Sequence, residues 1–371
     1  MQRTFLALSH SGAAIAFVVA VTAASGCSSA GGSSANALPN TNDARTMRVG
    51  HKAPAPAPTP ITFTFTGPID DPISKSNDNR VTGINNAREI VGNFGDDNDS
   101  LCGISNDPLN SFTSQWPYSA FSSENLPGAD GTYLSSLPLK SSTIQAGYVC
   151  EPHSLDPDSI WGTTVDQGIW TIIPKHSGEG MNSCKKWMKL FGINDSYNSV
   201  GAYKDPNCNP QPIEVSRSEV FTSFSPPNAV SAVATGISDT EAAVGFETLA
   251  SGAVQGWYAP NGAKGNYFVL SYPNSASTTP SGINSQGYVV GSYTDRSNKV
   301  HGFLLFNPAA PPSQMVWQEI DEPKNLGVTV VSGINDGDDI CGWYKGASSE
   351  YHGFVAMPSG SMRNIDRPLP R

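Results

Sequence analysis

Short apolar stretches of strand length alternate with turn residues along most of the chain, from Ile61 to Arg371. The stretches end at Gly, Asn, Asp or Pro, and the long 3.6-residue apolar period that indicates amphipathic helices is missing. Apolar stretches separated by turn residues at short intervals predict an all-β domain of many short strands.

The apolar stretches belong to an internal repeat with a fixed spacing. Five segments share the phrase Gly-Ile-Asn or Gly-Ile-Ser, and they begin at Gly83, Gly192, Gly236, Gly282 and Gly333. Nine residues after each of these glycines stands a second one, at Gly92, Gly201, Gly245, Gly291 and Gly342. An apolar residue precedes the second glycine, and an aromatic residue follows it closely. A spacing that recurs in this way indicates a repeat architecture.

The gap between Gly83 and Gly192 is about twice the other spacings, which predicts a degenerate copy inside it. Aligning the segment at Gly147 with the segment at Gly287 starts this copy at Ser142. The chain then holds six units, which start near residues 83, 142, 192, 236, 282 and 333.

Each unit contains four predicted strands. The first runs into Gly-Ile-Asn, the second carries Val-Gly-x-Tyr, and the third is His-Gly-Phe-Leu-Leu in its best copy, at His301. The fourth ends at a proline, such as Pro323, which cannot donate to a strand ladder. Four strands in repeats of about 45–59 residues match the period of a propeller blade. The sequence therefore predicts a six-bladed β-propeller, with an open β-repeat array or sandwich as the alternative.

The order of these phrases resembles the HAF repeat of extracellular bacterial proteins. The shared phrases are Gly-Ile-Asn-Asp, Val-Gly-x-Tyr, His-Gly-Phe-Leu and Ile-Asp-x-Pro. The repeat is named for a His-Ala-Phe step, in which Gly302 and Gly353 replace the alanine here. The resemblance covers Ile61 to Arg371 and implies an exported repeat domain. It implies neither an enzymatic activity nor a ligand.

Both ends of the repeat region carry a segment that resembles a fourth strand. One is Ile61–Phe65, before the first unit, and the other is Met362–Ile365, after the last unit. In a closed ring the two ends meet where the first and last blades join. We therefore expect backbone pairing between distant parts of the chain, which hides strand edges.

Residues 1–26 have the pattern of a lipoprotein signal peptide. Arg3 gives a short positive region, and the apolar stretch Ala13–Ala24 is shorter than the roughly 20 residues of a membrane-spanning helix. The stretch leads into Ala-Ser-Gly-Cys, which resembles a lipobox and predicts acylation of Cys27. The alternative is a plain secretory signal cut nearby, with Cys27 incidental.

Residues 27–60 read as a flexible tether, because Ser, Gly and Ala give way to a run of alternating prolines with too little apolar content for a fold. The propeller domain then spans residues 61–371. Ser28 after the acylated cysteine favours the outer membrane or cell surface, by analogy with other lipoproteins. We expect a monomer that touches the membrane only through its lipid anchor.

The net charge of −10 argues against nucleic acid as a partner, because no basic stripe is present to displace counterions. No cofactor is expected, and no residue is predicted to be catalytic or metal-ligating. The sequence contains no His-Glu-x-x-His, Cys-x-x-Cys or Gly-x-Ser-x-Gly motif. His301 and His352 occupy equivalent repeat positions, and we expect each to bond a neighbouring backbone carbonyl.

The third residue after each unit start is polar in all six units, at Asn86, Gln145, Asp195, Asp239, Ser285 and Asp336. In a closed ring these side chains would form a polar crown on one face. Asp195, Asp239 and Asp336 are therefore candidates for a ligand face that binds sugar hydroxyls or a cation. Ordinary turn chemistry is the alternative explanation.

Six cysteines suit an oxidising compartment. Cys184 and Cys208 flank one predicted hairpin and lie nearly opposite across its open end, which makes them a disulfide candidate. The pairing of Cys102, Cys150 and Cys341 stays open, with one thiol left over.

The chemistry of the chain favours a membrane-tethered binding or interaction module without catalysis, whose ligand is a glycan or a protein. The alternative is a propeller enzyme, a lyase or a glycoside-active hydrolase, that works in the central channel. Paired carboxylates facing the channel, or a coherent metal cluster, would favour the enzyme.

Overall fold

The computed structural model describes residues 58–72, 74, 78–95, 110–141, 143–150, 160–173 and 187–359. The chain divides into two compact units, Met1–Ala55 and Pro56–Arg371, and all described residues belong to the second. The signal peptide and Cys27 lie outside the described residues. Within the described ranges, no helix is long and apolar enough to cross a membrane.

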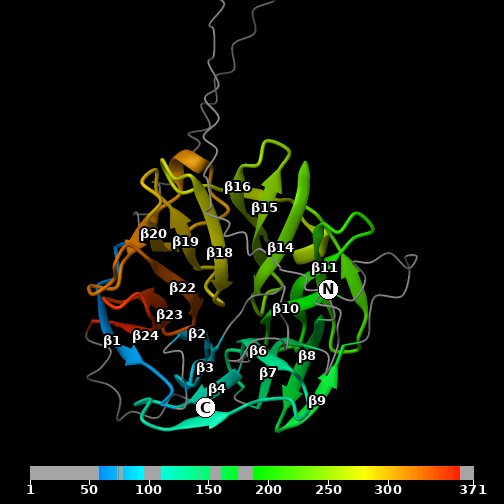
Figure 1. Ribbon diagram of the computed structural model, residues 1–371. Helices are drawn as coiled ribbons and strands as arrows, with labels where there is room; N and C mark the ends of the chain where they lie inside the picture. The colour runs from blue at the N-terminus through cyan, green and yellow to red at the C-terminus, as the bar shows by residue number, and fades with distance from the viewer. Residues whose placement is uncertain are drawn as a thin grey trace, which may run out of the picture. The chain divides into compact units, whose positions relative to one another are not determined.

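The second unit is a ring of antiparallel four-stranded sheets, as Figure 1 shows. Blades 1, 2 and 3 are β2 (Asn79–Ile84), β3 (Ile90–Phe94), β4 (Asn110–Ser114) and β5 (Phe121–Ser123); β6 (Gly131–Ser136), β7 (Ile144–Cys150), β8 (Ile160–Asp166) and β9 (Ile169–Ile172); and β10 (Met188–Ile193), β11 (Ser199–Lys204), β12 (Pro210–Val215) and β13 (Phe221–Ser223). Blades 4, 5 and 6 are β14 (Ala229–Ile237), β15 (Ala243–Leu249), β16 (Val254–Ala259) and β17 (Phe268–Leu270); β18 (Ser277–Ile283), β19 (Val289–Thr294), β20 (Val300–Leu305) and β21 (Trp317–Ile320); and β22 (Thr329–Ile334), β23 (Ile340–Lys345), β24 (Tyr351–Pro358) and β1 (Phe63–Ile69).

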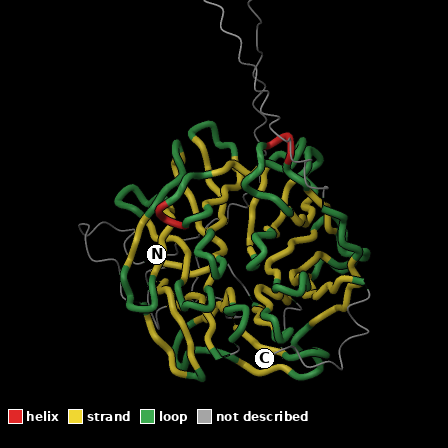
Figure 2. Tube along the Cα trace, turned by 180° about the vertical axis from the view of Figure 1, so that it is seen from behind, coloured by secondary structure: helices red, strands yellow, loops and turns green. Residues whose placement is uncertain are grey.

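Blades 4 and 5 are joined into one continuous sheet by a single parallel pair, Val254 with Ser277. Seen from behind, loops link the strands around the ring, and the two short 3₁₀ helices lie toward the rim (Figure 2). The prediction of an all-β six-bladed propeller is confirmed.

The ring closes through its own distant ends. β1 is the outer strand of blade 6 and pairs antiparallel with β24, so that Phe63 lies opposite Pro358. Thr66 adds a 2.8 Å side-chain hydrogen bond to the carbonyl oxygen of Val355. The predicted closure is confirmed for the N-terminal segment, whereas Met362–Ile365 lies outside the described residues.

The two repeated glycines are required by close packing inside each blade. A β-bulge interrupts the inner hairpin of every blade just before the Gly-Ile-Asn position, as at Val331/Gly333 in blade 6. The second glycine lies opposite the residue before the bulge, as Gly342 lies opposite Val331. A Cβ atom on Gly342 would lie 2.0 Å from the carbonyl oxygen of Val330. The same Cβ would also lie 3.0 Å from the ring of Phe354, which is fully buried on the third strand.

The glycine of His-Gly-Phe packs against the next blade. A Cβ atom on Gly302 would come within 2.6 Å of the side chain of Val331 in blade 6. A Cβ atom on Gly353 would meet Val81 of blade 1 at the same distance. These contacts explain why glycine stands at this position in both blades.

The asparagine of Gly-Ile-Asn joins successive blades. Asn194 accepts hydrogen bonds from two backbone N–H groups of its own turn, and its amide donates to the carbonyl oxygen of Ser238 in the next blade. Asn284 donates in the same way to Asn335. These side chains are almost fully buried, so the motif shapes the turn and links blades at once.

The start of the second unit is corrected from Ser142 to Ser136. In blade 2 Leu134 lies opposite Gly147, and the bulge falls before Ser136, which takes the place of the first glycine. Gly147 is therefore the second glycine, at a longer offset than in the other units. The unit itself is present, because its residues form β6 to β9.

Candidate functional site

The predicted polar crown forms a ring of hydrogen bonds at one end of the inner strands. The backbone N–H of Asp195 donates to Asp239 Oδ1 at 2.9 Å, and that of Ser285 donates to Asp336 Oδ1 at 3.0 Å. The N–H of Asp336 in turn donates to Asn86 Oδ1 at 2.9 Å, and the Asn86 amide donates back to Asp336 Oδ2. Each crown residue thus bonds its counterpart in the neighbouring blade.

The crown member from blade 2 is Lys140, and the expectation of Gln145 is wrong. Gln145 lies within β7 and is buried. The backbone N–H of Lys140 donates to Asp195 Oδ1 at 2.8 Å, and its ammonium lies 3.0 Å from Asp195 Oδ2 and 2.9 Å from Asp239 Oδ2. The longer inner turn of blade 2 causes the shift in register.

Lys140, Asp195 and Asp239 shift one another's pKa values. Burial raises the pKa of the Asp195 carboxyl, and the hydrogen bond with Asp239 raises it further. Burial would also raise the pKa of Asp239, but hydrogen bonds from Asp195 and Lys140 hold it below its usual value. The hydrogen bonds of the Lys140 ammonium with Asp239 and Asp195 raise the pKa of Lys140. The structure thus brings the predicted residues Asp195 and Asp239 together around the ammonium group of Lys140. Asp336 lies farther along the ring. All three aspartates accept hydrogen bonds from a neighbouring blade.

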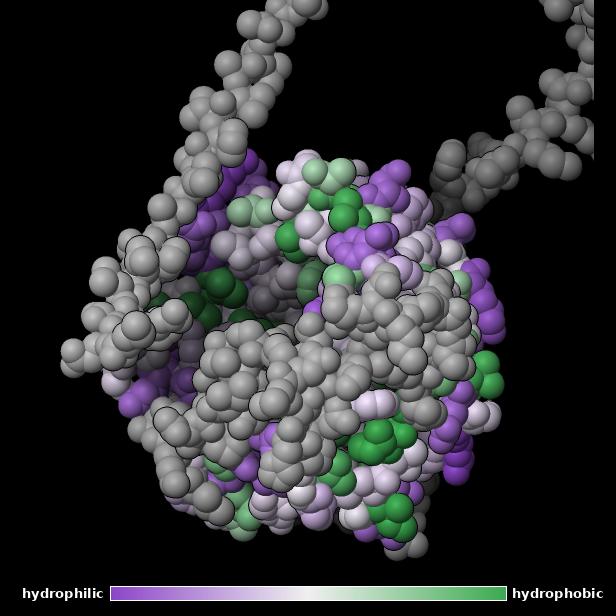
Figure 3. Space-filling view, turned by 45° about the vertical axis from the view of Figure 1, so that its right-hand side comes forward, coloured by the Kyte–Doolittle hydropathy of each residue, from purple (hydrophilic) through white to green (hydrophobic). Residues whose placement is uncertain are grey.

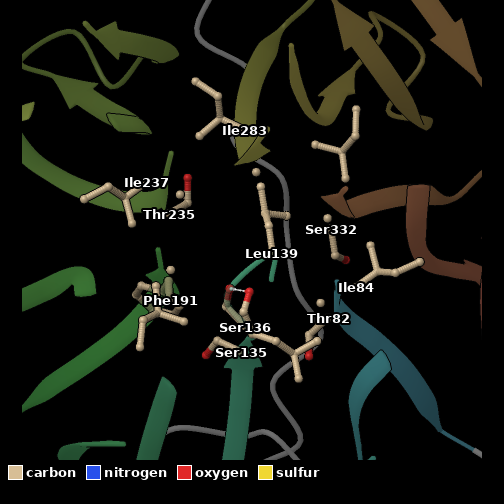
Figure 4. Close-up of a pocket in the computed structure, with 18 residues that line it drawn as sticks. Thr82, Ile84, Ser135, Ser136, Leu139, Phe191, Thr235, Ile237, Ile283 and Ser332 are labelled. Atoms are coloured by element: carbon tan, nitrogen blue, oxygen red, sulfur yellow. Dashed lines mark hydrogen bonds between the residues drawn. The ribbon is translucent and has the colours of Figure 1, made fainter. Parts of the chain in front are cut away.

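The central channel lies beneath the crown and is narrow. Its cavity of about 40 Å³ is lined by inner-strand residues of all six blades, among them Thr82, Phe191 and Ser332. Leu139 lies among these residues at the centre of the view in Figure 4 and is 8% exposed. The described lining consists of Gly, Ile, Leu, Phe, Ser and Thr, so it carries no acid–base pair.

Both repeat histidines bond carboxylates, and the expected bond to a backbone carbonyl is wrong. His301 Nδ1 lies 2.8 Å from Asp321 Oδ2, just after the outer strand of blade 5. His352 Nδ1 lies 2.9 Å from Asp70 Oδ2, at the same place in blade 6. The Asp of the repeated Ile-Asp phrase is therefore the partner of the third-strand histidine.

In blade 5 more groups gather around this pair. We call His301, Glu319, Asp321 and Asp295 the blade-5 cluster. One ligand atom from each of His301, Glu319 and Asp321 lies within 4.8 Å of the others. Asp295 Oδ2 lies 3.6 Å from His301 Nε2. Burial would lower the pKa of His301, but the carboxylates of Asp321, Glu319 and Asp295 raise it.

Aromatic rings border the blade-5 cluster. The ring of Tyr293 stacks on His301 at 5.1 Å and on Tyr272 at 3.7 Å, and its hydroxyl donates to Glu319. Trp317 meets Tyr272 edge-on at 5.3 Å. Tyr272, Trp317 and His301 are half-buried, and Glu319 is exposed. The cluster combines apolar ring faces, hydrogen-bond acceptors and an imidazole at the protein surface.

Sequence reasoning missed Lys140, Glu319 and Asp321. For Lys140 the signal was obscured by the longer turn of blade 2. For Asp321 a signal was present, because the Ile-Asp-x-Pro phrase recurs together with His-Gly-Phe. Glu319 lies one residue before this phrase, and only the strand register brings it to His301.

Among the described residues, Cys150 and Cys208 each take part in a disulfide bond. Cys341 is a buried free thiol. Cys184 and Cys102 lie outside the described residues, so the pairing of Cys184 with Cys208 stays a prediction.

No protein-family model and no curated protein matches the sequence. Among solved structures, AofleA from Arthrobotrys oligospora aligns with a TM-score of 0.48 and 11% identity, over 81% of this chain and 88% of that chain. The Trypanosoma rangeli sialidase aligns with a TM-score of 0.46 and 8% identity, over 82% of this chain and 60% of that one. The six-bladed fucose-recognising lectin of Aleuria aurantia aligns with a TM-score of 0.36 and 11% identity, over 76% and 95% of the two chains. At 8–11% identity and TM-scores below 0.5, these alignments support no conclusion about this chain.

Proposed function

We propose that this chain is a membrane-tethered binding module without catalysis, and that it holds a glycan at the blade-5 cluster. The observation that carries the proposal is the half-buried Tyr272 and Trp317 beside the carboxylates of Glu319 and Asp321. Apolar sugar faces pack on aromatic rings, and sugar hydroxyls donate to carboxylates. Binding sites commonly combine apolar rings with a few polar groups in this way.

A glycan fits this surface better than a protein partner. The large exposed hydrophobic side chains of the described ranges are spread around the ring: Ile169 and Ile172 in blade 2, Val220 in blade 3, Val230 and Val269 in blade 4, and Leu326 between blades 5 and 6. On the face seen in Figure 3, hydrophobic residues are scattered among hydrophilic ones. Protein interfaces favour contiguous apolar patches, whereas a polyhydroxylated ligand needs only local polar and aromatic groups.

Binding also fits the channel better than catalysis does. Leu139 lies at the centre of the channel lining, and the lining carries no carboxyl pair among the described residues. The crown carboxylates Asp195 and Asp239 are bound to Lys140 and to backbone N–H groups. Groups held in this way link the blades and are not free to act as acid and base.

The tether belongs to the proposal as well. Acylation of Cys27 would hold the protein at the cell envelope, at the outer membrane or cell surface, with residues 27–60 as a spacer. Replacing Cys27 with Ala should release the protein from the membrane fraction. Mass spectrometry should find acyl chains on Cys27 of the wild-type protein and none on the variant. A variant that stays in the membrane fraction, together with an unmodified wild-type N-terminus, would remove the anchor from the proposal.

The glycan proposal is tested by a glycan-array screen of the unit Pro56–Arg371, which forms a closed ring of its own. We expect one class of glycan to bind, and we expect Trp317→Ala to weaken that binding at least tenfold. The matched control is Trp343→Ala in blade 6, which lies outside the cluster and should bind as wild type. Thermal unfolding of both variants checks that the fold is intact. An empty array, or equal binding by the Trp317 variant, would overturn the proposal.

A further inference from the structure

We propose that the blade-5 cluster binds a divalent transition-metal ion, with Zn²⁺ as the probe, through His301, Glu319 and Asp321. One nitrogen and two carboxylate oxygens form a mixed ligand set that suits borderline ions such as Zn²⁺. Three protein ligands leave a coordination position open for a ligand oxygen. The inference rests on the proposed function of the same cluster and adds a cation to it.

The geometry needs only a small adjustment. His301 Nδ1 and Asp321 Oδ2 are 2.8 Å apart, and two ligands of a tetrahedral zinc ion lie about 3.4 Å apart at ordinary bond lengths. The second carboxylate oxygen, Asp321 Oδ1, is shielded from solvent and has no hydrogen-bond partner among the described residues. A buried carboxylate oxygen without a partner is costly, and a cation would satisfy it.

The surroundings orient the ligands as a metal site requires. With Nδ1 facing the cation, the opposite nitrogen of His301 faces Asp295 Oδ2 at 3.6 Å. Asp295 is itself held by the backbone N–H groups of Ser297 and Lys299. The Tyr293 hydroxyl donates to Glu319 in the same way. Metal-ligating histidines characteristically donate their second N–H to a carboxylate, and bonded second-sphere groups fix the ligands.

Blade 6 supplies an internal comparison, because it repeats the His–Asp pair without the other groups. His352 bonds Asp70, but Pro68 precedes Ile69 at a β-bulge, where blade 5 has Glu319 before Ile320. Gly346 stands where blade 5 has Asp295. A Cβ atom on Gly346 would lie only 2.7 Å from the imidazole ring of His352. The repeat therefore accounts for the His–Asp pair alone, and blade 6 has no carboxylate at the positions of Glu319 and Asp295.

Isothermal titration of the metal-free full chain in detergent with Zn²⁺ tests the inference, with Mn²⁺ and Ca²⁺ for comparison. We expect one Zn²⁺ equivalent that is lost in His301→Ala and weakened at least tenfold in Glu319→Gln, which keeps the side-chain shape. His352→Ala is the matched control and should keep the full stoichiometry. Circular dichroism melting of each variant checks the fold.

Three outcomes would overturn the inference: no Zn²⁺ bound by the wild type, unchanged binding by both blade-5 variants, or an equal loss in the His352 variant. Repeating the glycan screen with and without a chelator separates this inference from the proposed function. If a glycan binds and the wild type binds no metal, the metal inference is wrong and the glycan proposal stands. If Zn²⁺ binds at the cluster and no glycan binds, the glycan proposal is wrong and the metal inference stands.

Discussion

The side-chain amide nitrogen of Asn335 lies 3.0 Å from the backbone carbonyl oxygen of Asn85, 250 residues away in the chain. Asn335 Oδ1 at the same time accepts hydrogen bonds from the N–H groups of Gly337 and Asp339. One buried amide thus shapes the inner turn of blade 6 and joins that blade to blade 1.

Replacing Asn335 with Ala should destabilise the propeller by about 2–4 kcal/mol, because buried backbone groups lose their partners. The measurement is urea unfolding followed by tryptophan fluorescence. Blade 4 offers the converse change, since Ser238 stands at the asparagine position there. Ser238→Asn should add the missing link to blade 5 and raise the free energy of unfolding. An Asn335 variant as stable as wild type would show that the link contributes nothing.

Deleting Ile61–Pro68 should destabilise all six blades together, because β24 loses its outer partner and the ring opens. We expect a loss of several kcal/mol, a large share of the roughly 5–15 kcal/mol that stabilises a typical domain. Calorimetry should show a single transition at lower temperature. A chain that lacks residues 30–50 is the control and should melt as wild type does. Equal melting temperatures for the two deletions would contradict the role of β1.

Gly342→Ala should cost about 3 kcal/mol or more, because its new methyl group would overlap the carbonyl oxygen of Val330. Gly337→Ala in the same blade is the matched control. There the nearest atom to a new Cβ lies 3.4 Å away, which is an ordinary contact. Denaturant midpoints of the two variants should differ clearly. If they coincide, the second glycine of the repeat is not there for packing.

Lys140→Met should lower stability by up to about 1 kcal/mol at neutral pH, because the carboxylates of Asp195 and Asp239 then face each other without a cation. The pKa of Asp195 is raised above its usual value, mainly by burial. As pH falls through that pKa, Asp195 becomes neutral and the penalty should fade. Lys324→Met, at an exposed position, is the control. A penalty that grows toward acid pH would contradict this account.

Cys341 should resist alkylation in the folded protein. Burial raises the pKa of its thiol, so little reactive thiolate is present at neutral pH, and the side chain is fully shielded. Iodoacetamide labelling followed by peptide mass spectrometry should find Cys341 modified only after unfolding. Rapid labelling under native conditions would indicate that blade 6 opens readily.

The repeat spacing sufficed to predict the blades because each inner hairpin has a nearly constant length, so equal offsets mean equal places in the sheet. Blade 2 departs from this rule. Its longer turn moved the first repeat position to Ser136 and brought Lys140 into the crown, which no fixed offset could predict.

The partners of the histidines were harder to foresee for a different reason. Asp321 follows His301 by 20 residues, but the corresponding partner of His352 is Asp70, 282 residues away. Only the closure of the ring by β1 makes the two pairs equivalent. A search of neighbouring sequence would therefore find one pair and overlook the other.

The position of β1 also sets an order of events during synthesis. β1 leaves the ribosome before every other strand of the ring, but its partner β24 ends at Pro358. The first strand to be made is thus the last to find its place, and it stays unpaired while five complete blades emerge. Contacts between residues so far apart form slowly. The ring is consequently finished only after synthesis has passed its last strand, so the chain stays open for as long as it is being made.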